Sequence, residues 1–234
     1  MRLTLRGWAR TSEGVHVVDE TVGTEALTPP SDLGGDASGA TTPTDRPFEA
    51  LGFMLPIYDP MLAMFGRLWA VLGIPDSDDE LLARAGIQPG HRVLDVGCGT
   101  GRLAVRAQQE HPQATVVGFD PDPAALARAR AKAQGCGVQV GFDRAYADAL
   151  PYPDASFDRL LCSLMIRLLA GEERRNAFTE MRRVLTPTGS LHLVDFGTGE
   201  DVAAGLQQAG FTRGTVTRLR SRLAPQMAII DAQP

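Results

Sequence analysis

Three glycines at alternate positions constrain this chain more than any other feature. Gly97, Gly99 and Gly101 close residues 93–101 (VLDVGCGTG), where an apolar strand pattern leads directly into a helical pattern that begins at Arg102. Glycine has no Cβ, so the backbone can turn sharply there and approach a ligand closely. The amides that open the following helix then face that ligand as hydrogen-bond donors. The segment therefore predicts a loop that binds a nucleotide-like ligand.

An acidic residue follows the loop at the distance that such a site requires. Residues 116–120 (VVGFD) predict a second strand that ends in the carboxylate of Asp120. A separation of roughly 20 residues suits an acid that binds a ribose in a Rossmann-like βαβ unit. A dinucleotide site would need its third glycine at position 102, which is Arg102, so the G-x-G-x-G spacing argues against a nicotinamide dehydrogenase.

The rest of the chain after residue 89 alternates between strand and helix patterns. Alternation of this kind predicts an α/β fold, a Rossmann-like doubly wound and mostly parallel sheet with helices on both faces. We expect seven strands, the C-terminal one antiparallel, at residues 92–96, 115–119, 138–142, 157–163, 190–196, 213–219 and 226–231. We expect helices at residues 78–85, 102–111, 123–134, 172–185 and 201–209.

Two segments precede this α/β domain of residues 89–234. Residues 1–46 are rich in Gly, Thr, Ser, Pro and Asp and lack a periodic apolar pattern, which indicates a disordered or loosely attached arm. Folding over the site as a lid is the alternative for that arm. Residues 47–88 include a strongly apolar helical stretch and are expected to form a cap on the substrate side.

Composition limits the possible partners and the compartment. The chain has 234 residues and a net charge of −5, which argues against nucleic acid and anionic membrane surfaces as partners. No apolar run has the length of a membrane span, and residues 1–10 lack the apolar core of a secretory signal. The three cysteines show no metal-ligand spacing, so we expect no metal site, reduced thiols and a cytoplasmic protein. The oligomeric state is left open.

Four segments together resemble one enzyme family. They are similar to motifs of class I S-adenosylmethionine-dependent methyltransferases. The segments are the loop at 93–101, the strand end and helix at 118–130, the LPYPDASFD segment at 150–158 and the turn at 183–190. The resemblance covers about residues 90–196. Residues 58–69, with a Tyr-Asp pair ahead of FGRLW, resemble the small-molecule methyltransferases of ubiquinone and menaquinone biosynthesis.

The resemblance implies S-adenosylmethionine as cofactor and assigns roles to the residues of the loop. Asp95 would anchor the ammonium of the cofactor, and capping of nearby loop amides is the alternative. Asp120 would accept from the ribose hydroxyls, since a carboxylate offers only acceptors, and capping of the next helix is its alternative. The methionine part would lie along the backbone. The expected cofactor-binding residues of this part are Asp95, Gly97, Cys98, Gly99, Gly101, Asp120, Pro121 and Ser163.

The adenine end departs from the family pattern. Many members have an Asp-Ala pair four and three residues ahead of the Leu-Pro segment, whereas this chain has Tyr146 and Ala147 there, with Asp148 next. We expect Ala147 and Asp148 to lie at the adenine. Either the Asp148 carboxylate or backbone amides alone would bind its amino group.

The sequence offers no convincing general base, and the acceptor stays open. Residues 163–169 contain no histidine where relatives often have a pair, and Tyr58 is the one catalytic candidate, with a core aromatic as its alternative. Methyl transfer does not require a base, because positioning of well-oriented reactants alone supplies of order 7–11 kcal/mol. We expect methyl transfer to O, C or N of a small, partly apolar molecule. The alternatives are a nucleic-acid or protein methyltransferase and a cofactor-binding regulatory module without turnover.

Overall fold

The computed structural model describes residues 8–10, 77–219 and 226–234. The expected cap of residues 47–88 is therefore described only from residue 77, and Tyr58 lies outside the described residues. The same is true of all but three residues of the expected arm 1–46.

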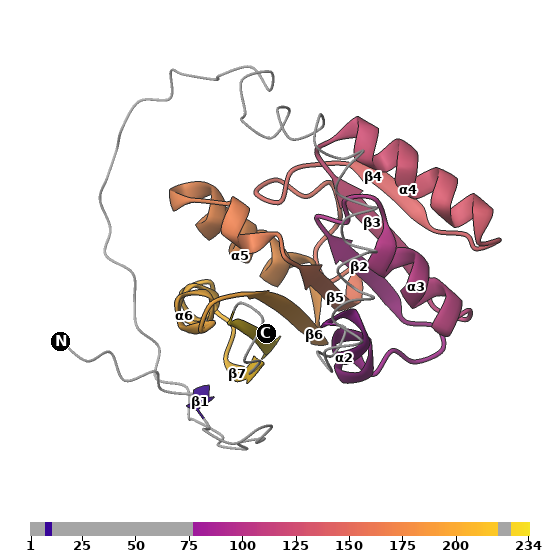
Figure 1. The fold of residues 1–234 in the computed structure, drawn as a ribbon. Helices are drawn as coiled ribbons and strands as arrows, with labels where there is room; N and C mark the ends of the chain where they lie inside the picture. The colour runs from indigo at the N-terminus through magenta and orange to yellow at the C-terminus, as the bar shows by residue number, and fades with distance from the viewer. Residues whose placement is uncertain (1–7, 11–76, 220–225) are drawn as a thin grey trace, which may run out of the picture.

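The described chain forms one mixed sheet with helices on both faces (Figure 1). Its strands are β1 (Trp8–Arg10), β2 (Arg92–Val96), β3 (Thr115–Asp120), β4 (Gly141–Arg144), β5 (Phe157–Ser163), β6 (Leu185–Phe196), β7 (Arg213–Leu219) and β8 (Met227–Gln233). Their spatial order is β1-β7-β8-β6-β5-β2-β3-β4. The pairs between β4, β3, β2, β5 and β6 are parallel, and β8 lies antiparallel between β6 and β7. The predicted doubly wound, mostly parallel fold with an antiparallel C-terminal strand is confirmed.

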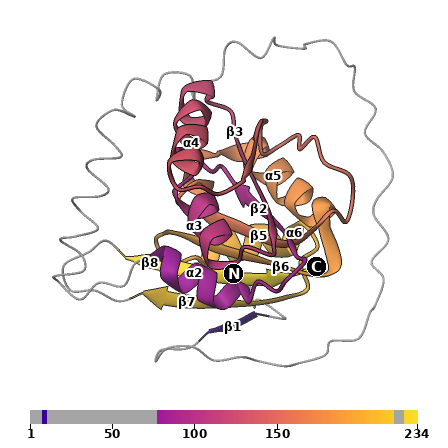
Figure 2. The same cartoon turned by 90° about the vertical axis from the view of Figure 1, so that its right-hand side faces the viewer.

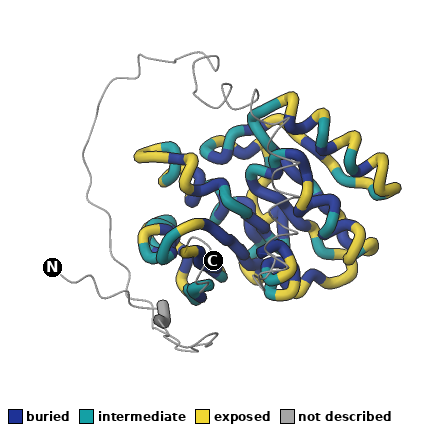
Figure 3. Tube along the Cα trace, in the orientation of Figure 1, coloured by how far each residue is buried: buried dark blue, intermediate teal, exposed yellow. Residues whose placement is uncertain are grey.

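Two layers of helices bury the two faces of the sheet. The helices are α2 (Ser77–Ala85), α3 (Arg102–Glu110), α4 (Pro123–Gly135), α5 (Gly171–Val184), α6 (Glu200–Gln208) and the 3₁₀ turn η3 (Ile166–Leu168). One core contains apolar side chains of α2, α3 and α4, among them Leu81, Leu103 and Leu126. The other contains side chains of α5 and α6, such as Phe178 and Val202. Among the described residues, the strands between them are the most buried part (Figure 3).

β4 and β6 begin at other residues than predicted. The strand expected at 138–142 begins only at Gly141, because a capping turn follows the end of α4: the Val138 amide donates to the Ala133 carbonyl, and Gly137 adopts a φ of +68°. The strand expected at 190–196 begins at Leu185, which pairs with Phe157 before the register shifts. The pairing with β5 lengthens β6 toward its N-terminus, and the local sequence pattern does not predict that pairing.

A short eighth strand lies at the edge of the sheet. Residues Trp8–Arg10 form β1, which pairs in parallel with β7 through Trp8 and Gly214 (Figure 2). This strand falls inside the segment that we expected to be an arm.

The parallel strands place their carboxyl ends along one edge of the sheet. Asp95 lies in β2, Asp120 ends β3, Ser163 ends β5, and Asp195 lies near the end of β6. This is the edge at which ligands bind in open α/β sheets.

Candidate functional site

The glycine loop between β2 and α3 is held by backbone hydrogen bonds. The Cys98 amide donates to the Phe119 carbonyl over 2.8 Å, and the Gly101 amide donates to the Cys98 carbonyl over 2.8 Å. Gly101, at a φ of +75°, precedes the first residue of α3. A Cβ on it would lie 2.7 Å from Cβ of Ala129, so Gly101 lets α3 and α4 approach each other.

The other two glycines of the loop differ in what lies beside them. Both have positive φ angles, +67° for Gly97 and +52° for Gly99, which favour glycine. A Cβ on Gly97 would lie 2.4 Å from Cγ of Met165, so this glycine is packed against the turn after β5. A Cβ on Gly99 would meet nothing within 4 Å among the described residues. The backbone is therefore open to a ligand at Gly99.

Asp95 is buried, and its carboxylate caps α3. Its side chain is 2 % exposed, and the Ala104 amide donates to Oδ2 over 3.0 Å. Burial is the main reason that the pKa of Asp95 rises to about 8, and the nearby Asp78 charge raises it further. The alternative made from the sequence was capping of loop amides, whereas this carboxylate accepts from the first turn of α3, a bond that does not exclude a ligand.

Asp120 closes the loop from the end of β3. Its Oδ2 accepts from the Gly99 amide over 2.9 Å, and its Oδ1 accepts from the Asp122 amide over 2.9 Å. The cap of α4 is Asp122, whose Oδ1 accepts from the Ala124 amide. Because Asp122 performs the capping, Asp120 is not needed for it, and its half-buried carboxylate retains further acceptor positions.

Cys98 and Pro121 contact the protein in different ways. The Cys98 side chain is buried against Gly118, whose Cβ would lie 2.9 Å from the sulfur, and burial raises the pKa of this thiol far above its usual value. Its side chain therefore belongs to the core. Pro121 follows Asp120, is partly exposed, and accepts from Nε of Arg144 over 3.1 Å.

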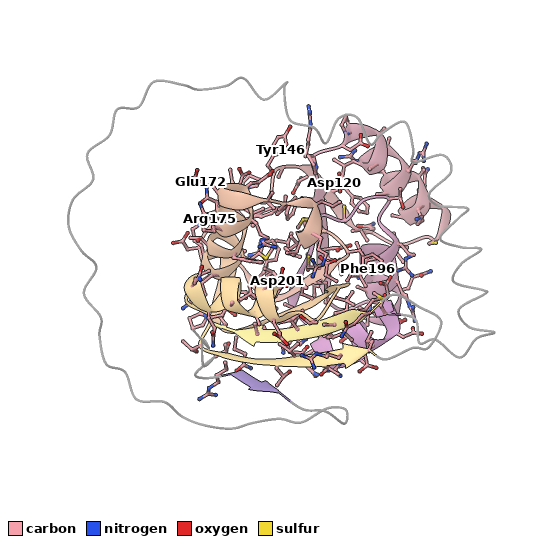
Figure 4. The ribbon with its side chains drawn as sticks, turned by 60° about the vertical axis from the view of Figure 1, so that its left-hand side comes forward. Asp120, Tyr146, Glu172, Arg175, Phe196 and Asp201 are labelled. Atoms are coloured by element: carbon pink, nitrogen blue, oxygen red, sulfur yellow. The ribbon has the colours of Figure 1, made fainter. Side chains whose placement is uncertain are left out.

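The predicted adenine residues form a tight turn beside Asp120. The Ala149 amide donates to the Tyr146 carbonyl over 3.1 Å, which makes Ala147 and Asp148 the central residues of the turn. The Ala145 amide donates to the Asp120 carbonyl, so this turn and the end of β3 are adjacent (Figure 4). Ala147 is buried and Asp148 is partly exposed.

At the end of β5, Ser163 contacts Asp78 of α2, an acid that the sequence did not indicate as part of the site. Oγ of Ser163 donates to Oδ1 of Asp78 over 3.4 Å, and Nη2 of Arg102 lies 2.8 Å from Oδ2 of Asp78. Asp78 is fully buried although it is the second residue of α2. No signal pointed to it, because only packing of α2 brings it to this edge.

The next residues on this edge form an apolar rim with a strained turn. Leu164 follows Ser163 at a φ of +58°, which is uncommon for a side chain with a Cβ and often accompanies functional sites. Leu168 of η3 is 51 % exposed and Phe196, at the end of β6, is 38 % exposed (Figure 4). Between them, Nε of Arg167 donates to the Phe196 carbonyl, and Nη2 lies 3.5 Å from Oδ1 of Asp201.

His192 is held inside the protein and does not face this edge. Its Nε2 lies 2.8 Å from Oγ of Ser190, and its Nδ1 lies 2.8 Å from Oδ1 of Asp231. These three side chains make a Ser-His-Asp chain, but Ser190 is 8 % exposed and Oδ2 of Asp231 accepts from Arg84 of α2. A nucleophile needs access to its substrate, so the chain is a structural network that joins α2 to the sheet.

The described part of the chain contains no group of three or more His, Cys, Asp or Glu side chains placed to bind a metal ion. Among the helices at residues 77–208, none has the length and apolar character of a membrane span.

Comparisons with known proteins agree with these motifs. Residues 93–189 match a family model described as a methyltransferase domain. The demethylmenaquinone methyltransferase of Deinococcus radiodurans is 43 % identical over 105 residues, which are 45 % of this chain and 43 % of the relative. The chain spans about half the length of the curated relatives it matches.

Solved structures share the fold. The [4+2]-cyclase SpnF matches with a TM-score of 0.61 and 21 % identity over 67 % of this chain and 79 % of that one. An S-adenosylmethionine-dependent methyltransferase from Aquifex aeolicus matches with a TM-score of 0.55 and 20 % identity over 67 % and 88 % of the two chains. Residues 93–189 thus match a methyltransferase domain, and the chain is similar in sequence to demethylmenaquinone methyltransferases and to a C-methyltransferase of ubiquinone and menaquinone biosynthesis.

Proposed function

We propose that the chain transfers a methyl group from S-adenosylmethionine to a small, partly apolar acceptor. The observation that carries the proposal is the open backbone at Gly99, whose amide donates to the Asp120 carboxylate and which lies in the loop that follows Asp95. A Cβ at this glycine would project into space that no described residue fills, and the two acids suit a ligand with an ammonium group at one end and a ribose at the other. The residues present therefore fit the cofactor.

Each residue of the loop has a role in this proposal. Asp95 binds the ammonium, and Asp120 binds the ribose hydroxyls while it holds the Gly99 amide. Gly97 and Gly101 contribute by shape, because their missing Cβ atoms allow the close contacts with Met165 and Ala129. Cys98 contributes its backbone, since its thiol is buried in the core.

The outer parts of the site bind the two ends of the cofactor. Pro121 and the turn of Ala147 and Asp148 border the adenine, next to the end of β3. Ser163 is at the opposite end, where it donates to Asp78. For the chain as a whole we propose the division made from the sequence: an arm at 1–46, a cap at 47–88 that provides Tyr58, and a cofactor-binding domain at 89–234.

Methyl transfer requires mainly that the protein position the two reactants. S-adenosylmethionine supplies an activated methyl group on a positively charged sulfur. The acceptor forms a bond to that methyl as the sulfur–methyl bond breaks, and the proton that the acceptor loses goes to water. The protein orients the two molecules in line, an effect of order 7–11 kcal/mol for well-oriented reactants, and no histidine of the described residues faces the site edge.

The acceptor side is apolar, which favours a molecule with a hydrophobic part. Leu168, in η3 after β5, and Phe196, the last residue of β6, are the large apolar side chains that the described residues expose. β5 pairs with β2, which leads into the glycine loop, and β6 pairs with β5. The relatives named demethylmenaquinone methyltransferase make reduced quinones the first acceptors to test. The cytoplasm remains the proposed compartment.

The donor is tested first, by calorimetric titration of the purified chain. S-adenosylmethionine and S-adenosylhomocysteine should bind and NAD should not. Asp120→Ala should weaken binding at least tenfold, since it removes two ribose hydrogen bonds. Asp122→Ala is the matched control: it removes the cap of α4, costs about 0.5–2 kcal/mol of stability, and should leave binding unchanged.

Methyl transfer is tested next, with quinols, phenols, amines and fatty acids as acceptors. Turnover on a quinol or phenol would support the proposal. Tight binding of NAD without binding of S-adenosylmethionine would refute it. SpnF shares this fold and is a cyclase. If the chain binds the donor but methylates none of the acceptors, the result would favour a cofactor-binding protein without methyl transfer.

A further inference from the structure

The segment that follows the turn at residues 146–149 is bound to the end of α5. The turn leads directly into Leu150, which is buried. The Leu150 amide donates to Oε2 of Glu180 over 2.8 Å, and the Leu150 carbonyl accepts from Nη2 of Arg183 over 3.0 Å. Two side chains from one turn of α5 therefore hold both backbone polar groups of Leu150.

The guanidinium of Arg183 uses all three of its nitrogens at this place. Nε and Nη2 each donate to the Glu180 carboxylate over 2.7 Å. Nη1 donates to the Tyr152 carbonyl over 2.8 Å, in addition to the bond from Nη2 to Leu150. Nη1 also contacts Asp154, but that side chain is 79 % exposed, so the contact contributes little. A planar guanidinium can join a carboxylate and two carbonyls at once, which the single nitrogen of a lysine does not do.

The same turn is held at its entry by the end of β3. The Ala145 amide donates to the Asp120 carbonyl over 3.4 Å, and the Ala149 amide closes the turn on the Tyr146 carbonyl over 3.1 Å. Only residues 146–149 lie between these contacts at the entry and the contacts of Leu150 at the exit. Because so short a segment is held at both ends, the direction of its polar groups depends on both sets of contacts.

We propose that Glu180 and Arg183 are positioning residues of the donor site, which hold the turn at 146–149 in the direction that binds the polar edge of the adenine. The inference rests on the proposed function, which puts Ala147 and Asp148 at the adenine. Glu180 and Arg183 act through the turn and do not touch the ligand, since they bind each other and the backbone that follows the turn. Polar groups held in one direction discriminate between ligands, because they cannot turn to suit another pattern of donors and acceptors.

The test compares two ligands that differ only at that edge. S-inosylhomocysteine has a carbonyl oxygen and an N–H where S-adenosylhomocysteine has an amino group and an unprotonated nitrogen, so donor and acceptor are exchanged. In calorimetric titrations the unmodified chain should bind S-adenosylhomocysteine at least about fivefold more tightly, as expected from one or two hydrogen bonds. Arg183→Met removes the guanidinium and should reduce this ratio of dissociation constants to about two or less.

The neighbouring arginine provides the matched control. Arg182 lies in the same turn of α5, but its Nε donates to the Gly210 carbonyl after α6, so Arg182→Met should leave the ratio unchanged. Arg183→Lys separates charge from shape: it keeps a positive charge beside Glu180 but cannot hold the two carbonyls as well, so the ratio should fall as it does for Arg183→Met. This milder variant keeps the inference testable if Arg183→Met does not fold.

Urea denaturation of the same variants measures the structural contribution of Arg183 separately. A variant of Arg183 that loses stability but keeps the ratio of the unmodified chain would assign the pair a purely structural role and overturn the inference. Equal binding of the two ligands by the unmodified chain would also overturn it, because the turn would then not bind the polar edge of the adenine. If the unmodified chain binds neither ligand nor S-adenosylmethionine, the proposed function itself is refuted.

Discussion

Replacing Asp95 by asparagine should stabilise the free protein while it weakens the cofactor site. The pKa of Asp95 is about 8 in the folded chain and 3.8 in a model peptide. Between these values the folded state binds a proton that the unfolded state has lost, so stability falls as the pH rises. At pH 7 the difference is up to about 4 kcal/mol, from 1.36 kcal/mol per unit over roughly three units.

The asparagine variant removes this penalty and keeps the local structure. Its side-chain oxygen can still accept from the Ala104 amide, so the cap of α3 remains. We therefore expect Asp95→Asn to raise the free energy of unfolding by about 2–4 kcal/mol at pH 7. The same variant should bind S-adenosylmethionine at least tenfold more weakly, because it has lost the charge that holds the ammonium. Opposite signs for stability and binding are the signature of a residue kept for its ligand.

Urea denaturation of the ligand-free protein at several values between pH 5 and 8.5 provides the assay. The stability gain of the variant should grow by about 1.4 kcal/mol per pH unit and level off above pH 8. Asp79→Asn, whose side chain is 57 % exposed, is the control and should change stability by less than about 1 kcal/mol at every pH. A variant that is less stable than the unmodified chain at pH 7, or a gain that does not depend on pH, would refute the reasoning.

Three further predictions concern packing, a buried ion pair and the acceptor. Gly101→Ala should lower the free energy of unfolding by about 2–4 kcal/mol in urea denaturation, since it combines a φ of +75° with a contact of 2.7 Å to Ala129. Gly90→Ala is the control, because Gly90 has a φ of +84° but open space around it, and its loss of stability should be clearly smaller. Equal losses for the two variants would contradict the packing argument. Interactions with His192 and Arg84 lower the pKa of Asp231 in the folded protein. The stabilisation by its carboxylate is therefore present above the pKa of the unfolded state and is lost as the pH falls through the pKa of the folded state. Asp231→Asn should lower the free energy of unfolding by about 1–3 kcal/mol at pH 7, and this loss should shrink below pH 4 in acid titrations followed by circular dichroism. Phe196→Ala should raise KM for a quinol severalfold and leave the Kd for the donor unchanged, and a change in both would place Phe196 in the donor site instead.

The sequence by itself determined the alternation of strands and helices and the position of the loop. Apolar periodicity and the alternate glycines are local properties of the chain, so the bounds of β2, β5 and β7 agree with the prediction. β4 and β6 begin elsewhere, because a helix end and a strand pairing decide where they start.

Only the tertiary structure decided how these residues meet. It brought Asp78 next to Asp95 from a helix 17 positions earlier, since α2 packs against the same face as α3. It also gave the capping of α4 to Asp122, which leaves Asp120 for a ligand, and buried His192 against Asp231. Spacing along the chain predicts which groups reach the edge of the sheet, whereas burial and neighbouring charge, which set their protonation, depend on elements that are distant in sequence.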